Sequence, residues 1–460
     1  MTAGQKRLIC LILLCTTQFV ALLDFSITMI PLPQIQASLN FTPGGLQWVI
    51  NAYGVAIAGF LLLGGRAADL FGRRRVFLTG LIVFTLASLI GGFAQTPTML
   101  VITRALQGFG AALFSPAALS ILLSVFTLER ERNKALGAWT AVAATGFVAG
   151  LILGGLITDV LSWRWVLWVN VPIGLIIMLL SPVLPVGLPP AGTPKVSLDI
   201  LGALLVASGS AMLIYAFANS EHVGIHHPVT YGLMLLALAI LALFVWSQTK
   251  AKHPIMPLAV FGARGTGGAN LVSLLGNTAL GPTFIITALY MQSVLAFTPT
   301  QAGLGLLPMA VCFTLASAWL GPILVARIGA KATINAGMVV FVAGLLLLGS
   351  ALGTDSAWAA SVLPGTVIAG IGYGTAFPAW TVAGIADVAP EHHGIAGGML
   401  TTTQEVGSAI GLAIAVAVSI SVTASGGSEA DSYAYAILLS AALVFAGLLA
   451  SVFVLPSKRS

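Results

Sequence analysis

Long apolar runs alternating with short charged loops define the pattern of this chain. Each run spans about 18 residues or more, and a helix of that length crosses the roughly 30 Å hydrocarbon core of a bilayer. The sequence therefore predicts fourteen membrane-spanning helices, at 8–31, 46–64, 76–95, 99–126, 135–157, 166–184, 200–219, 229–246, 269–291, 302–326, 332–352, 357–380, 395–422 and 433–455.

The basic residues fall almost entirely on one side of the predicted membrane. With the N-terminus in the cytoplasm, 17 of the 19 Lys and Arg residues are cytoplasmic, Arg164 is external and Arg104 lies inside a helix. Cytoplasmic loops of membrane proteins carry an excess of Lys and Arg, so the number of crossings and their orientation support each other. We expect a multi-pass protein of the cell membrane with both termini in the cytoplasm.

Composition leaves little room for a soluble domain. Hydrophobic residues make up 58% of the chain and charged residues 7%, against about a quarter charged in globular proteins. Cytoplasmic loops that face anionic lipid headgroups explain the net charge of +6, so we expect no nucleic-acid partner. Cys10, Cys15 and Cys312 lie in apolar runs without metal-ligand spacing, and we expect no metal site.

Similar segments recur at nearly constant offsets in the two halves of the chain. The matched residues, each given with its counterpart, are Phe41 and Phe297, Thr42 and Thr298, Gly64 and Gly321, Gly72 and Gly329, Gly80 and Gly337, Gly110 and Gly372, and Pro116 and Pro378. We predict an all-α membrane protein with two six-helix bundles, at residues 1–190 and 263–460, and two inserted central helices at 191–262.

These segments also resemble a known family, the major facilitator superfamily, and within it the fourteen-helix branch of drug:proton antiporters. The resemblance covers essentially the whole chain and rests on Asp24 in the first helix, the stretch 64–75 with Asp69 and the basic cluster after Gly72, Arg104 with Gln107 and Gly108, and the stretch 162–174 with Asn170. It implies the major facilitator fold and transport by alternating access.

The resemblance also implies an antiporter signature in the fifth helix. Gly146, Gly150, Gly154 and Gly155 match that signature, although Leu151 stands where the family has proline. Read from the residues alone, glycines at four-residue spacing make a seam for close helix packing or bending.

Two carboxylates, Asp24 and Glu405, remain within the bilayer once all charges are placed. An intramembrane charge costs a few kcal/mol or more unless it faces water or a partner, so such residues are functional candidates. Asp24 and Arg104 lie at similar depths and are candidates for proton coupling; a fixed ion pair that locks the N-terminal half is the alternative. Glu405 is a second coupling candidate, a counter-charge for a cationic substrate, or an acid held by threonine hydroxyls between packed helices.

Two further groups of residues complete the predicted site. Polar and aromatic positions within the helices are candidates for lining a substrate cavity: Gln18, Asn51, Tyr53, Asn277, Tyr290, Tyr373, Trp380, Gln404 and Glu405. The loop after the second helix predicts a cytoplasmic gate made of Gly65, Asp69, Gly72, Arg73 and Arg74, because an acid among basic residues can form contacts that opening would break. Simple anchoring by the arginines is the alternative.

We expect a proton-coupled antiporter that exports hydrophobic drugs or antibiotics, cationic ones among them, as a functional monomer in the lipid bilayer. The sequence has no Gly-rich phosphate loop followed by Lys and Ser or Thr, so the proton gradient rather than ATP is expected to supply the energy, with no cofactor. The sequence shows no nucleophile and base placed together at the membrane interface, so we expect no enzymatic activity. A dedicated exporter of one endogenous metabolite and a non-transporting membrane sensor are the alternatives.

Overall fold

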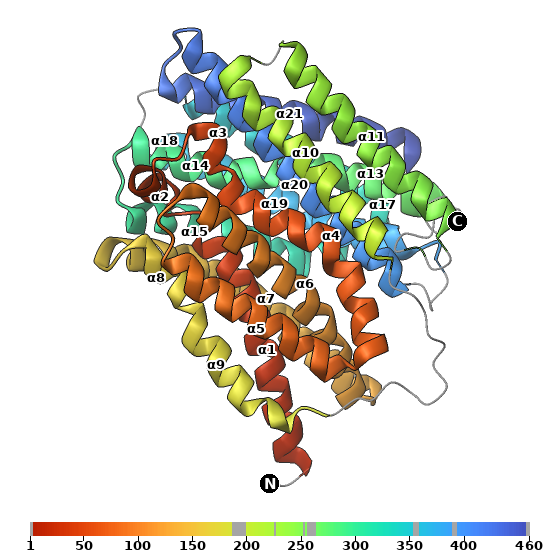
Figure 1. The fold of residues 1–460 in the computed structure, drawn as a ribbon. Coiled ribbons are helices and arrows are strands. Elements are labelled where there is room, and N and C mark those ends of the chain that lie inside the picture. Colours follow the sequence, from red (N-terminus) through yellow and green to blue (C-terminus); the bar gives the residue numbers. More distant parts are fainter. Residues whose placement is uncertain are drawn as a thin grey trace. The chain divides into compact units, whose positions relative to one another are not determined.

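Helices make up most of the part of the chain that the structure describes. The structure is a computed structural model, and it describes residues 3–185, 199–224, 227–251, 254, 264–352, 358–388 and 393–456. These residues form helices and connecting turns without a strand, and fourteen helices are long and apolar enough to cross a membrane (Figure 1). The predicted all-α fold with fourteen crossings is confirmed.

Two compact units make up the fold. The first contains residues 1–40, 48–207 and 251–253, and the second contains residues 41–47, 208–250 and 254–460. The predicted boundaries near residues 190 and 262 fall in 186–198 and 255–263, which lie outside the described residues. The division into two bundles and two inserted helices therefore stays a prediction.

The first unit is built around three helix pairs. In each pair the two helices pack closely along their length: α4 on α6, α5 on α6, and α1 on α7. Its helices are α1 (Ala3–Ile27), α2 (Leu32–Leu39), α4 (Trp48–Phe71), α5 (Arg73–Gly92), α6 (Pro97–Val125), α7 (Glu129–Val160), α8 (Trp163–Trp168), α9 (Asn170–Leu180), the short 3-10 helix Ser181–Val183 and the beginning of α10 (Ile200–Val223).

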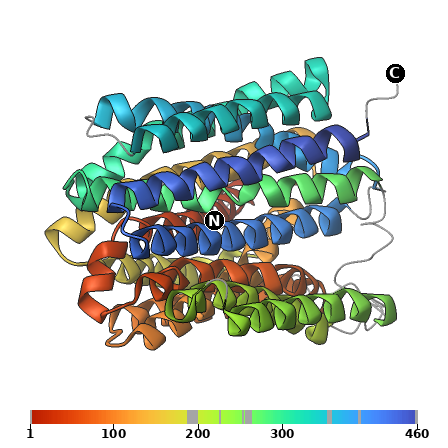
Figure 2. The same cartoon turned by 90° about the horizontal axis from the view of Figure 1, so that it is seen from above.

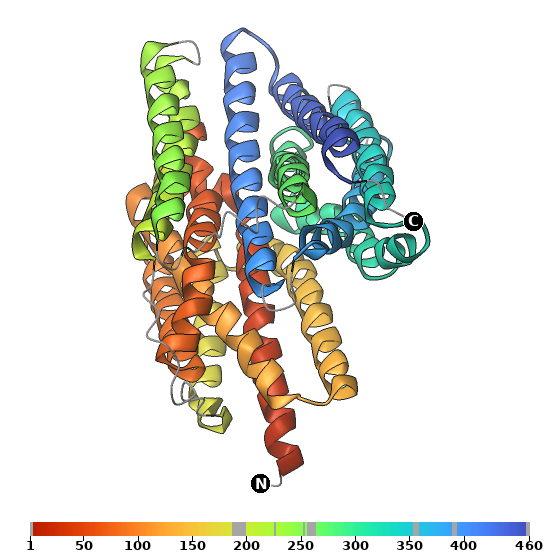
Figure 3. The same cartoon turned by 90° about the vertical axis from the view of Figure 1, so that its right-hand side faces the viewer.

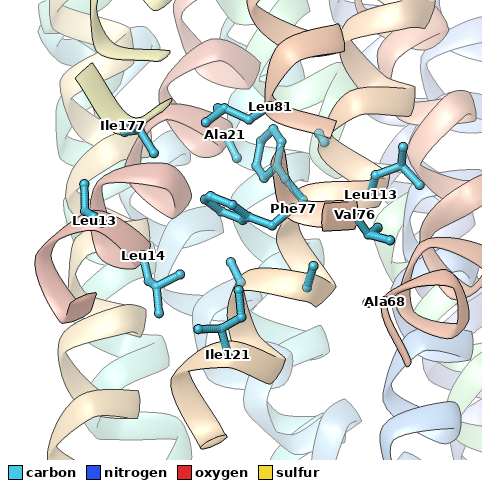
Figure 4. Packing of buried hydrophobic residues seen from close by; sticks show 14 of the residues in the cluster. Leu13, Leu14, Ala21, Ala68, Val76, Phe77, Leu81, Leu113, Ile121 and Ile177 are labelled. Atoms are coloured by element: carbon cyan, nitrogen blue, oxygen red, sulfur yellow. The ribbon is translucent and has the colours of Figure 1, made fainter. Parts of the chain in front are cut away.

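Aromatic and branched side chains fill the interior of this unit (Figure 4). Phe84 and Phe114 meet edge to face with ring centroids 5.5 Å apart, and Phe77 is fully buried beside them in the same cluster. Large apolar side chains such as Leu179 are exposed, which suits a lipid-facing surface. Since lipid is as apolar as these side chains, close packing rather than removal from water holds the helices together.

The second unit contains the remaining helices. Within it α17 packs on α19 and α21, and α13 packs on α19, α20 and α21; Figure 2 shows α21 running alongside α13. Its helices are α3 (Pro43–Leu46), most of α10, α11 (Pro228–Lys250), α13 (Arg264–Asn277), α14 (Leu280–Ser293), α15 (Pro299–Leu315), a π-helical turn (Ala316–Leu320), α16 (Gly321–Ile328), α17 (Ala330–Leu352), α18 (Trp358–Ser361), α19 (Leu363–Ile385), α20 (His393–Ala424) and α21 (Glu429–Val454).

Helices α10 and α11, which the sequence predicts as inserted, form an antiparallel hairpin (Figure 3). Gly209 of α10 lies directly against the side chain of Leu241 of α11. Most of the surface of α11 is apolar and exposed, including Leu235, Leu238 and Trp246. Such a face matches a lipid environment.

The internal repeat extends to backbone details. Gly72 and Gly329, which the sequence aligns, break their helices with φ angles of 95° and 82°. Asn40 and Ala296 share a φ of 55°, and the threonines that follow them at the same spacing, Thr42 and Thr298, each cap the next helix. A left-handed φ is uncommon outside glycine, so its recurrence at matched positions indicates that the two halves fold by the same local rules.

Candidate functional site

Asp24 and Arg104 form an ion pair in the interior of the first unit. The guanidinium Nη1 of Arg104 donates to Asp24 Oδ2 at 2.6 Å, and both side chains are fully buried. Two charges withdrawn from water are stable together only when their geometry is good and their other polar atoms are bonded. The two residues lie in one site, as the sequence predicts. Their role in proton coupling stays a prediction.

Two amides complete the coordination of the carboxylate. Gln107 Nε2 donates to Asp24 Oδ1 at 3.0 Å, and Asn170 Nδ2 donates to the same oxygen at 2.6 Å. Both amide side chains are fully buried. With the bond from Arg104, the carboxylate accepts three hydrogen bonds, and bonds of this charge-assisted kind are roughly twice as strong as neutral ones.

Arg104 is held from several sides as well. Its Nε donates to the carbonyl of Val49 at 2.9 Å, its Nη2 donates to the hydroxyl of Thr28 at 3.4 Å, and its guanidinium lies 4.7 Å from the ring centre of Tyr53. A planar guanidinium suits such a site because its donors point in fixed directions and its face stacks on an aromatic ring. Lysine could not reproduce these contacts.

The helix geometry explains why these residues meet. Arg104 and Gln107 are three residues apart on α6 and so share one face of that helix. Asp24 lies in the last turn of α1, and Asn170 is the first residue of α9. The site thus combines a helix face with two helix ends.

The sequence prediction missed Gln107 and Asn170 as site residues. Both belong to stretches that carry the family resemblance, but a neutral amide in a helix gives no energetic signal comparable with that of a charge. The three-residue spacing from Arg104 was a usable signal for Gln107. Asn170 is 146 positions away from Asp24, and nothing in the sequence alone links the two.

A second polar and aromatic group lies in the second unit. The hydroxyl of Tyr373 donates to Asn277 Oδ1 at 2.8 Å, and its ring meets that of Trp380 with centroids 5.5 Å apart. All three side chains are buried, and the indole nitrogen of Trp380 has no hydrogen-bond partner among the described residues. Phe313 and Phe341 pack against Tyr373 and complete an aromatic cluster.

Glu405 lies on α20 in the same unit. Its carboxyl interacts electrostatically with the phenol of Tyr373, and its side chain is partly buried. No ion pair involves Glu405 in the described ranges. The neighbouring Thr403 donates to Asn270 Oδ1 at 2.9 Å rather than to Glu405, and Gln404 Nε2 is buried without a partner there.

The predicted cavity residues therefore separate into local groups. Gln18, Asn51 and Tyr53 belong to the first unit, and Tyr53 contacts Arg104. Asn277, Tyr373 and Trp380 meet in the second unit, whereas Tyr290 packs against Tyr433, with ring centroids 6.4 Å apart. A single cavity lined by all of them stays a prediction. Among the described residues, no three His, Cys, Asp or Glu side chains form a group that could hold a metal ion.

The predicted gate residues lie on both sides of the break between α4 and α5, so the segment predicted as a loop is helical except at Gly72. Asp69 Oδ1 lies 3.9 Å from Arg73 Nη2, and Arg73 also donates to the carbonyl of Ser120 on α6 at 3.4 Å. Gly72 supplies the left-handed φ that joins the two helices, and Gly65 lies near Pro116. Arg74 has a buried Nε without a described partner. Since the Asp69–Arg73 pair is largely exposed, it contributes little stability of its own.

The glycines of α7 line the contact with α1. A Cβ placed on Gly146, Gly150 or Gly154 would come within 2.7 Å of the carbonyl oxygen of Phe19, Leu23 or Ile27, respectively. Gly155 is buried beside them. Two of the contacted residues, Leu23 and Ile27, flank Asp24, so this seam sets how closely α7 approaches the segment that carries the buried acid.

The sequence is similar to an export protein and to resistance proteins of bacteria. It is 38% identical over 408 residues to the cephamycin export protein CmcT of Amycolatopsis lactamdurans, covering 88% of this chain and 83% of that protein. It is 36% identical over 405 residues to the puromycin resistance protein pur8 of Streptomyces alboniger, covering 88% and 80%. It is 32% identical over 412 residues to the multidrug resistance protein Stp of Mycobacterium tuberculosis, covering 89% and 75%.

Solved structures share the fold at low sequence identity. A mutant of the nucleoside transporter NupG superposes with a TM-score of 0.69 at 16% identity, covering 97% of this chain and 99% of that one. An auto-inhibited peptide transporter of the POT family superposes with a TM-score of 0.68 at 17% identity, covering 98% and 97%.

A family profile gives the most direct assignment. Residues 14–263, more than half of the chain, match the profile of the Major Facilitator Superfamily. Together with the identities to export and resistance proteins over most of its length, this match establishes that the chain belongs to the Major Facilitator Superfamily.

Proposed function

We propose that this protein is a proton-coupled antiporter that exports hydrophobic drugs or antibiotics across the cell membrane. The observation that carries the coupling is the fully buried Asp24, bonded to Arg104, Gln107 and Asn170. An acid at this depth is costly unless it serves transport or is permanently paired. The similarity to a cephamycin export protein and to puromycin and multidrug resistance proteins supports the substrate class.

Burial suggests how a proton drives the cycle. Because Asp24 has no exposed surface here, a proton reaches it only after the helices around it separate. The charged acid favours the closed cluster, since it accepts three hydrogen bonds there. Protonation removes the charge and weakens the attraction to Arg104, which shifts the population toward an opened arrangement. Alternation between these two arrangements couples proton entry from outside to export.

Glu405 is the second acid in the proposal. Among the described residues it lacks the saturated hydrogen bonding of Asp24, and it lies near Tyr373, whose ring meets that of Trp380. Negative charge beside aromatic faces suits an organic cation, because both attract positive charge. We propose that Glu405 is the counter-charge for cationic substrates, with the proton as the alternative ligand of this carboxyl.

The remaining features follow from the same proposal. Both termini lie in the cytoplasm, and the protein works as a monomer in the lipid bilayer. The proton gradient supplies the energy for export, and no cofactor takes part. The segment 65–74, at the end of α4 and the start of α5, acts as the cytoplasmic gate, and the protein is not an enzyme. A dedicated exporter of one endogenous metabolite is the rival function, and a non-transporting sensor is a weaker one. A panel of dyes and antibiotics separates these, since a dedicated exporter would move one chemical class and a sensor none.

The experiment uses inside-out vesicles with an acidic lumen, in which export appears as uptake of a fluorescent dye or an antibiotic. The unaltered protein should accumulate substrate while the gradient lasts. Asp24→Asn keeps the side-chain volume and removes the titratable group, so gradient-driven uptake should fall at least tenfold while downhill exchange of substrate persists. Full gradient-driven uptake by Asp24→Asn would leave the Asp24–Arg104 pair with a purely structural role.

A further inference from the structure

The three groups that bond Asp24 differ in whether they can change from donor to acceptor. A carboxylate accepts hydrogen bonds, whereas a protonated carboxyl must also donate one. The cluster is fully buried, so water does not reach the proton in this arrangement. One of the three neighbours therefore has to accept it.

Arg104 cannot accept the proton, because a guanidinium has donors alone. Gln107 is fixed in its orientation by its neighbours. The hydroxyl of Ser88 donates to the carbonyl of Phe84 at 2.8 Å and so accepts from Gln107 Nε2 at 2.7 Å. The other end of the amide, Gln107 Oε1, accepts from Arg104 Nη1 at 3.0 Å. Turning this amide over would place two donors together at Arg104 and break the bond to Ser88.

A single hydrogen bond fixes the orientation of the Asn170 amide among the described residues. Its Nδ2 donates to Asp24 Oδ1 at 2.6 Å, while its Oδ1 is buried and has no hydrogen-bond partner among the described residues. A half-turn of the amide exchanges these two atoms and presents an acceptor to Asp24 at the same position. The bond that Asn170 now makes is re-formed with its direction reversed, and no partner of Oδ1 is lost in the process.

We infer that Asn170 is the positioning residue that accommodates both protonation states of Asp24, an inference that rests on the proposed function. With Asp24 charged, Asn170 donates to Oδ1. When a proton from the aqueous side binds Oδ1, the amide turns and its oxygen accepts that proton in a hydrogen bond. The protonated Oδ1 still accepts from Gln107, and Oδ2 still accepts from Arg104. The turn of the amide itself breaks no other bond of the closed cluster, and the proton enters and leaves when the helices around Asp24 separate.

Few ionisable groups face Asp24. Arg104 on α6 and Tyr53 on α4 lie at the cluster, and α9 carries no charged residue. Helix α7 approaches α1 through Gly146 and Gly150, and its charged residues lie near its two ends. The charged residue of α8, Arg164, donates to the carbonyl of Ala94. The response to pH is therefore set mainly by Arg104 and the two amides.

Two substitutions test this assignment in the vesicle assay over a range of pH. Asn170→Asp keeps an acceptor but places a second carboxyl 2.6 Å from Oδ1, so the pair should hold a proton to higher pH. The pH of half-maximal driven uptake should rise by about one unit or more. Asn170→Leu has neither a donor nor an acceptor. The fold-loss of driven uptake in this variant should be at least ten times the fold-loss of downhill exchange.

The background of Asp24→Asn separates positioning from packing. If Asn170 acts through the proton on Asp24, adding Asn170→Leu to Asp24→Asn should change downhill exchange less than twofold. Asn335→Leu, the same substitution at an amide bonded to Ser451 in the second unit, is the control and should leave the pH of half-maximal uptake unchanged.

The inference is overturned if both Asn170 variants keep the original pH profile, or if Asn170→Leu slows exchange equally with and without Asp24. These outcomes differ from failure of the proposed function. That failure would appear as undiminished driven uptake in Asp24→Asn itself, before any change at Asn170.

Discussion

Glu405 differs from Asp24 in two ways that suit substrate binding. Its carboxyl is only partly buried, and it has no ion-pair partner in the described part of the chain. Glu405→Gln preserves size and removes the charge. We expect uptake of cationic substrates to fall about tenfold or more, which corresponds to about 1.4 kcal/mol, while neutral substrates lose less than twofold. Competition between a cationic and a neutral dye in inside-out vesicles measures the difference.

The matched control for this prediction is Glu429→Gln. Glu429 is an exposed acid at the start of α21 and bonds the hydroxyl of Tyr433, away from the Tyr373 group. It should leave selectivity unchanged. Equal loss for both dyes in Glu405→Gln would contradict the counter-charge role and favour a proton site at this carboxyl.

Charge explains which site residues the sequence could reveal. Asp24 and Arg104 stand out because an ionised side chain in hydrocarbon demands a reason. Asn170 and Gln107 do not, because neutral amides occur in many helices for other reasons. Asn270, for example, donates to the carbonyl of Thr266 on its own helix. The orientation of an amide, on which the role assigned to Asn170 depends, has no signature in the sequence at all.

At the scale of helices, the contact of α7 with α1 controls the surroundings of Asp24. Gly150→Ala would place a methyl group 2.7 Å from the carbonyl oxygen of Leu23 and 3.0 Å from the amide of Ile27. Backbone atoms cannot move aside as a side chain can, so the helices must separate, at a cost of about 1–3 kcal/mol. We expect a lower melting temperature in detergent and a loss of driven uptake of about tenfold or more.

Gly137→Ala on the same helix is the internal control. A Cβ at Gly137 meets no atom within 4 Å, so the substitution should stabilise α7 by up to about 1 kcal/mol through helix propensity. Transport should be unchanged. A Gly150→Ala protein as stable and active as Gly137→Ala would show that the seam needs no close approach.

The apolar runs located the helices but not their interruptions. The predicted helix 166–184 is divided into α8 and α9 at Val169, and the predicted helix 269–291 is divided between Asn277 and Leu280. A break in backbone hydrogen bonding leaves the hydropathy of a segment unchanged, because both halves keep the same apolar side chains. The break at Val169 places Asn170 at the start of α9, where its amide donates to Asp24.

At the scale of the whole molecule, the repeat shows why the fold was predictable. Gly80 lies against Gly110 and Phe114, and its counterpart Gly337 lies against Gly372 and Ala376 at matched positions. Only glycine lets two helix backbones approach so closely, so both halves have glycine at these contacts. The repeat is therefore visible in the sequence. The substrate path has no such constraint, and its residues could be proposed from polarity alone.

The orientation in the membrane is tested by cysteine labelling. In a protein with Cys10, Cys15 and Cys312 replaced by alanine, single cysteines are introduced at Glu221 and Ser428, on the predicted external side, and at Lys134 and Lys195, on the predicted cytoplasmic side. Lys195 lies outside the described residues, whereas Lys134 is exposed on α7. Ser428 caps α21, and its loss costs about 1 kcal/mol, which a fourteen-helix fold tolerates.

A charged maleimide added to intact cells cannot cross the hydrocarbon core, so it reports the external side alone. It should label the cysteines at 221 and 428 and spare those at 134 and 195, and permeabilised cells should expose all four. The expectation rests on the split of Lys and Arg between the two sides, which is a property of every loop together rather than of any one loop. Labelling at 134 or 195 in intact cells would reverse the orientation, and with it the direction in which Asp24 receives its proton.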